Sequence, residues 1–76
     1  MSDRFPVVTA KQVVKVLQKT KFEFKRQSGS HAIYQRLKDK RRTVVPIHSK
    51  RVLKRKTLKA ILDDAGLTID QFKELL

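Results

Sequence analysis

The sequence contains no cysteine and no tryptophan, and it has only two glycines and two prolines in 76 residues. The lack of cysteine excludes a disulfide framework and a thiolate metal site. The two histidines and seven carboxylates do not have the spacing of metal ligands, so we expect no metal and no cofactor. No apolar run has the length of a signal peptide or a membrane-spanning helix. We therefore expect an intracellular, cytoplasmic protein that does not bind membranes.

Negative charge is also scarce, with seven Asp and Glu residues against 19 Lys and Arg residues and a formal net charge of +12. Residues 11–59 hold 17 of these cations and only two carboxylates, Glu23 and Asp39, whereas residues 60–76 are net acidic. A surface that only keeps a small domain in solution usually mixes its signs. The concentration of one sign predicts a polyanionic partner, and cations that serve solubility alone are the less favoured interpretation.

The apolar pattern predicts a helix near the beginning of the chain and three strands after it. Thr9 and Gln12 have the spacing of a capping box, which starts a helix over about residues 10–20. Pro46 cannot donate to a strand on both sides, so we expect the last strand to lie at a sheet edge or to be bulged. Alternation of apolar and polar residues places the three strands at residues 22–27, 31–37 and 42–49.

The last third of the chain has a helical pattern. An apolar stripe ends at Ala65, and Gly66 is placed as the left-handed residue that ends this helix. Thr68 and Gln71 repeat the capping-box spacing and start a short final helix. The simplest arrangement is an α+β fold of one domain, residues 1–76, in which helices pack on one face of a three-stranded antiparallel meander.

The run Ser28-Gly29-Ser30-His31 stands between the first two predicted strands. Gly29 can adopt a positive φ without steric cost, and a turn of this composition can hold a phosphate through backbone N–H groups. Ser-Gly is also common in ordinary hairpin turns. The spacing alone therefore leaves two interpretations open, a phosphate-binding turn and a plain hairpin.

His31 has the same parity as Ile33, so we expect it at the rim of the helix-covered face rather than in solvent. Histidine is the side chain best suited to proton transfer near neutral pH. General acid–base cleavage of RNA, in which the ribose 2′-hydroxyl is the nucleophile, needs such a group. A strand-end histidine that only forms local hydrogen bonds is an equal alternative at this point.

Three further side chains are candidates for RNA contact. Tyr34 and Arg36 have the opposite parity from Ile33, so we expect both on the open face of the sheet. There they could stack on bases or pack against a protein partner. His48 follows the third strand's apolar residues, and for it a partner-binding or structural role is favoured over an acid–base pair with the first histidine.

A basic cluster, Lys54-Arg55-Lys56, falls where the second long helix begins, and Lys50 and Arg51 precede it. Exposed cations at a helix N-terminus oppose the helix dipole, typically by roughly 0.3–1 kcal/mol each. An anion bound there is favoured by both the dipole and the cations. We expect this cluster to contact phosphates, with a loose basic loop as the alternative.

Three motifs combine along the chain, namely Gly29-Ser30-His31, Val45-Pro46-Ile47-His48 and Ala65-Gly66-Leu67. With them, nearly the whole chain resembles the HicA-type mRNA interferase toxins of the HicAB toxin–antitoxin family. The resemblance implies a double-stranded-RNA-binding-domain-like fold and a metal-independent ribonuclease that acts on mRNA. It also implies that His31 is the catalytic residue and that a cognate HicB-type antitoxin covers the active site.

The chain departs from the family pattern at Lys21, where relatives often have glycine just before the first-strand aromatic residue. The departure leaves His31 and its glycine in place. Two function hypotheses follow: a toxin endoribonuclease, or a non-catalytic RNA-binding module of the same fold in which His31 only contacts RNA. A structural, ribosome-associated role would explain the charge but not the Gly-Ser-His run.

Overall fold

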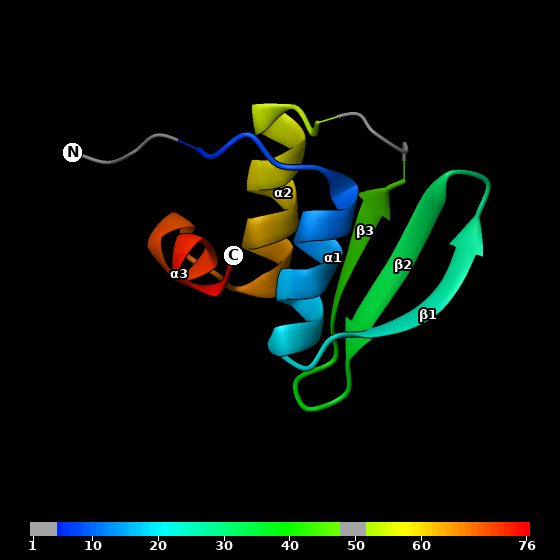
Figure 1. The fold of residues 1–76 in the computed structure, drawn as a ribbon. Helices are drawn as coiled ribbons and strands as arrows, with labels where there is room; N and C mark the ends of the chain where they lie inside the picture. The colour runs from blue at the N-terminus through cyan, green and yellow to red at the C-terminus, as the bar shows by residue number, and fades with distance from the viewer. Residues whose placement is uncertain (1–4, 48–51) are drawn as a thin grey trace.

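The structure, a computed structural model, describes residues 5–47 and 52–76. The helices and strands follow one another in the order α1 (Ala10–Lys19), β1 (Glu23–Ser28), β2 (His31–Arg36), β3 (Arg41–Pro46), α2 (Arg55–Ala65) and α3 (Ile69–Leu75). The strands form one antiparallel sheet in the order β1-β2-β3, and the helices lie on one face of it (Figure 1). The predicted α+β fold is confirmed.

Both predicted capping boxes are present. The Gln12 N–H donates to the Thr9 hydroxyl at 3.4 Å, and the Thr9 N–H donates to the Gln12 side chain at 2.9 Å. Thr68 and Gln71 repeat the arrangement at the beginning of α3, at 3.1 and 2.9 Å. Each box satisfies two of the N–H groups that a helix leaves without partners at its first turn.

A residue in the left-handed conformation follows each of the two longer helices. Gly66 ends α2 with φ +74°, as predicted, and Lys21 follows α1 with φ +75°. After Lys21, the Phe22 N–H donates back to the Leu17 carbonyl at 2.9 Å, and the residue after Gly66 makes the equivalent bond, also at 2.9 Å. The left-handed conformation costs a non-glycine residue about 1–2 kcal/mol. Lys21 therefore has a backbone conformation that suits glycine, and this conformation is strained for a lysine.

The core lies between the helices and the face of the sheet that they cover. The buried hydroxyl of Thr43 donates to the Asp64 carboxylate at 3.3 Å, and no buried side-chain polar atom lacks a partner in the described part of the chain. Burial of each large apolar side chain contributes about 1.5–3 kcal/mol. These side chains come from both the sheet and the helices, and include Val13, Leu17, Phe22, Tyr34, Val45, Leu58, Ile61, Leu62 and Phe72.

The register of the strands decides which side chains face the helices. Tyr34 is only 7% exposed and belongs to the core, so His31 and Ile33 face the other side, which we call the open face. The predicted common parity of His31 and Ile33 holds, but the prediction that this parity is the covered one is wrong. Ile33 is 9% exposed on the open face because Arg26 and Val44 lie directly opposite it on the two neighbouring strands.

The outer strands each carry one feature that a regular strand lacks. In β1 the register shifts between Phe24 and Arg26, so Lys25 forms a β-bulge. In β3 the last residue is Pro46, which has no backbone N–H to donate. β3 is an edge strand, as predicted from Pro46.

Candidate functional site

The turn between β1 and β2 is a two-residue hairpin loop of Gly29 and Ser30, with Ser28 directly opposite His31. Gly29 has φ +59° and Ser30 does not have a positive φ, which is the pattern of a type II′ turn. A Cβ added to Gly29 would meet nothing within 4 Å, so glycine is needed here for the backbone angle and not for space. The Gln27 side chain donates to the Gly29 carbonyl at 3.0 Å and braces the turn.

His31 is exposed on the open face, between Ser28 of β1 and Pro46 of β3. The prediction that it lies at the rim of the covered face is wrong, because the helices that the structure describes all pack on the other side of the sheet. The Ile47 N–H donates to the Ser30 carbonyl at 2.6 Å, which ties the end of β3 to the turn. The imidazole is therefore accessible to a large substrate and stands on backbone that is held from both sides.

Among the described residues, the open face carries one cation near His31, which the sequence interpretation missed, and a second cation farther away. Arg26 lies opposite Ile33, one same-face position from the Ser28–His31 pair, and Arg42 lies two such positions away from His31. Both arginines are exposed. Once the turn is fixed at residues 29 and 30, Arg26 has the parity of Ser28, and this signal could have found it.

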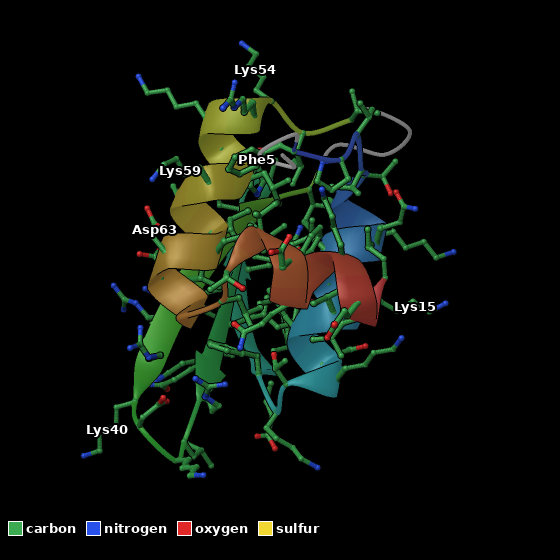
Figure 2. The ribbon with its side chains drawn as sticks, turned by 90° about the vertical axis from the view of Figure 1, so that its left-hand side faces the viewer. Phe5, Lys15, Lys40, Lys54, Lys59 and Asp63 are labelled. Carbon is green, nitrogen blue, oxygen red and sulfur yellow. The ribbon has the colours of Figure 1, made fainter. Side chains whose placement is uncertain are left out.

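The basic cluster is at the beginning of α2, as predicted. Lys54 is the N-cap residue without a side-chain cap, and the first turn of α2 contains no acidic residue. Arg55 lies over the Phe5 ring, 5.0 Å from its centroid. All three cations, Lys54, Arg55 and Lys56, are exposed, and Lys54 points away from the rest of the protein (Figure 2). The beginning of α2 and the β1–β2 turn lie toward the same end of the molecule (Figure 1).

Tyr34 lies on the covered face, so its predicted position on the open face is wrong. Its ring packs edge-on against Phe24, with 5.8 Å between the centroids. Burial raises the pKa of the Tyr34 phenol. The strand alternation was correct, but a tyrosine suits a core as well as a surface, and the parity alone did not say which face the helices cover.

Arg36 is on the covered face as well, contrary to the prediction. Its guanidinium donates to both carboxylate oxygens of Asp39, at 3.1 and 2.8 Å, and to the Thr20 carbonyl at the end of α1, at 3.1 Å. Its Cζ atom is 4.7 Å from the centroid of the Phe22 ring. The hydrogen bond from Arg36 holds the pKa of the Asp39 carboxyl at about 2, below its ordinary value of 3.8. Arg36 therefore joins α1 to the β2–β3 connection.

The remaining predicted contacts, His48, Lys50 and Arg51, lie outside the described residues. Within residues 5–47 and 52–76, no three His, Asp or Glu side chains are grouped so that they could hold a metal ion. The site consequently consists of His31, the turn before it and Arg26 on the open face, with the basic cluster of α2 toward the same end. Arg42 lies farther along the open face, outside this site.

Comparison with protein-family models matches residues 10–67 to the family described as HicA toxin of bacterial toxin-antitoxin. The matched region runs from the first residue of α1 to just past the end of α2, so it includes the whole sheet and the site. The comparison with curated proteins gives no match. None of the helices that the structure describes is both long enough and apolar enough to span a membrane. The chain belongs to the HicA family of toxins from bacterial toxin–antitoxin systems.

Proposed function

We propose that this toxin is a metal-independent endoribonuclease that cleaves mRNA in the cytoplasm with His31 as its general acid or base. The observation that carries the proposal is the position of His31. It is an exposed imidazole at the beginning of a central strand, on a face that also presents cations, in a chain of the HicA toxin family. A histidine titrates near neutral pH, so it can both accept and release a proton under cellular conditions.

The chemistry requires little more than this arrangement. The ribose 2′-hydroxyl attacks the adjacent phosphorus as its proton passes to a general base, and the bond from phosphorus to the 5′-oxygen breaks. The leaving 5′-oxygen takes up a proton, and the products are a 2′,3′-cyclic phosphate and a 5′-hydroxyl. A positioned proton-transfer group contributes about 10²- to 10⁴-fold to such a step.

RNA is held by backbone and cations around this histidine. The turn at Ser28, Gly29 and Ser30 offers N–H and hydroxyl donors to one phosphate. The basic cluster at the beginning of α2 holds phosphates farther along the strand, toward the same end of the molecule. His48, Lys50 and Arg51 remain proposed contacts, whereas the covered positions of Tyr34 and Arg36 remove them from this surface.

A HicB-type antitoxin is the proposed protein partner, and it would block cleavage by covering the open face around His31. This face suits a protein contact because it has apolar as well as charged side chains. Val44 is exposed there beside Ile33, with Arg26 on the other side of Ile33 and Arg42 two residues away along β3. A partner that covers these side chains also keeps RNA away from the imidazole.

The test compares the wild type with His31→Ala on a long single-stranded RNA in excess EDTA. We expect the variant to lose cleavage by about 100-fold or more and to keep RNA binding. Its midpoint of thermal unfolding should match the wild type, because the side chain is exposed. Equal cleavage by both proteins overturns the catalytic assignment. RNA binding without cleavage by either protein would identify a non-catalytic RNA-binding module of the same fold.

A further inference from the structure

Arg26 is the described cation closest in strand register to His31. It lies on β1 directly opposite Ile33, which is two residues from His31 on β2, and all three positions share the open face. Such diagonal neighbours in an antiparallel pair are about 7–8 Å apart, within joint reach of long side chains. A guanidinium from Arg26 and an imidazole from His31 can therefore contact one phosphate group together.

The guanidinium of Arg26 is available to a ligand. Within residues 5–47 and 52–76 its side chain makes no hydrogen bond or ion pair, and it is exposed. Its neighbours are engaged. Lys25 donates to the Gln35 side chain at 2.8 Å, and Arg36 and Arg41 both pair with Asp39.

The proposed reaction needs a fixed positive charge beside its proton-transfer group. As the 2′-oxygen attacks, negative charge builds up on the two non-bridging oxygens of the phosphate. A donor already aimed at developing charge stabilises the transition state more than the ground state. Arginine suits this task because its guanidinium is always ionised and its forked N–H groups match two phosphate oxygens.

We propose that Arg26 is a second catalytic residue, whose guanidinium binds the non-bridging oxygens of the phosphate at which His31 acts. This role rests on the proposed ribonuclease function. The bond from the 2′-oxygen to phosphorus forms as the 2′-proton passes to a base, and the bond from phosphorus to the 5′-oxygen breaks as that oxygen gains a proton. Arg26 exchanges no proton in either event and carries hydrogen bonds to the phosphate throughout.

Arg42 provides a matched control for Arg26. It is an exposed arginine on the same open face, opposite Gln35, which is four residues from His31 along β2. At about 3.4 Å per residue this offset is about 13–14 Å, too far for both side chains to share one phosphate with His31. Arg26→Ala and Arg42→Ala therefore remove the same charge from the same face at two distances from the imidazole.

The experiment measures the single-turnover cleavage rate at saturating protein, and the affinity for an RNA with 2′-O-methyl groups throughout, which cannot be cleaved. We expect Arg26→Ala to lower the saturating rate by about 100- to 1,000-fold. Arg42→Ala should keep the wild-type rate, and both variants should weaken binding to a similar extent. Arg26→Lys should recover part of the lost rate, because it restores the charge without the fork. Thermal unfolding of each variant controls for folding.

The outcomes separate this role from the function on which it rests. If the wild type cleaves and His31→Ala does not, the ribonuclease function stands, and equal saturating rates for Arg26→Ala and Arg42→Ala overturn the role of Arg26. A wild type that does not cleave RNA overturns both proposals.

Discussion

The two ends of the sheet use their charged side chains in opposite ways. At the β2–β3 connection, Asp39 accepts hydrogen bonds from Arg36 and pairs with Arg41, while Arg36 also reaches the end of α1. At the β1–β2 turn, the described contacts are made mainly through backbone, and His31 is left exposed to solvent. In this strongly basic chain, the position of one carboxylate thus decides which arginines serve the fold and which remain available to a ligand.

Among these variants, removal of the Arg36 side chain at the β2–β3 connection should cause the largest loss of stability. We expect Arg36→Ala to lower the free energy of unfolding by about 2–3 kcal/mol, because it removes several charge-assisted hydrogen bonds of a half-buried side chain. Urea unfolding followed by circular dichroism measures the change. Arg42→Ala on the open face should stay within about 0.5 kcal/mol of the wild type. Equal losses in the two variants would show that the arginines are not divided in this way.

Substitution of the two glycines tests the same contrast between the two ends of the sheet through the backbone. Gly66 has φ +74°, and a Cβ there would come within 2.9 Å of the Arg41 guanidinium carbon. We expect Gly66→Ala to cost about 1–2 kcal/mol in the free energy of unfolding. Gly29→Ala makes no such contact, but the first central position of a type II′ turn suits glycine more strictly than the left-handed region does, so its loss of stability should be at least as large. It should also reduce cleavage, because the turn that positions His31 must adjust, whereas Gly66→Ala should leave cleavage unchanged. Equal cleavage by the two variants would contradict this comparison.

A substitution at Lys21 should stabilise the end of the molecule that contains the β2–β3 connection. Its φ of +75° follows α1 directly, and glycine adopts this conformation without strain. Lys21→Gly removes the strain of the left-handed conformation but adds conformational entropy to the unfolded chain. The net effect should raise the free energy of unfolding by about 0.5–1 kcal/mol. Lys15→Gly, within α1, is the control and should lower it by about 1 kcal/mol. If both variants are destabilised, the strain at Lys21 does not lower the stability of the protein.

The smallest expected effect is the pH dependence of the Asp39 contacts. The pKa of Asp39 is lowered to about 2 in the folded protein from its ordinary value of 3.8. The carboxylate therefore contributes stability above about pH 4, and this contribution is lost as the pH falls through about 2. The midpoint of thermal unfolding of the wild type should exceed that of Asp39→Asn above pH 4, and the two should converge toward pH 2. A constant difference across this range would show that Asp39 acts through packing alone.

Sequence reasoning succeeded where the rule depends only on spacing. The capping boxes at Thr9 and Thr68 follow from the third residue after each threonine, and the left-handed end of α2 follows from Gly66. The parity that places His31 with Ile33 was also correct, because it depends on nothing beyond strand alternation.

It failed where the answer depended on what packs against the sheet. Both parities of β2 contain large apolar side chains, since Ile33 is buried on the open face and Tyr34 on the covered face. Arg36 resembled a surface residue because its partners, Asp39 and the Thr20 carbonyl, meet it only in the folded chain. Arg26 was missed because its relation to His31 depends on the register across the turn.

The two outer strands have a consequence for how any protein can recognise this toxin. The bulge at Lys25 and the missing N–H of Pro46 interrupt the regular row of donors and acceptors that an incoming strand would need. A partner strand that paired with the outer edge of β1 or β3 would form an interrupted set of backbone hydrogen bonds. Recognition is therefore expected to occur through the side chains of the open face, and the same irregular margins disfavour edge-to-edge pairing of two copies.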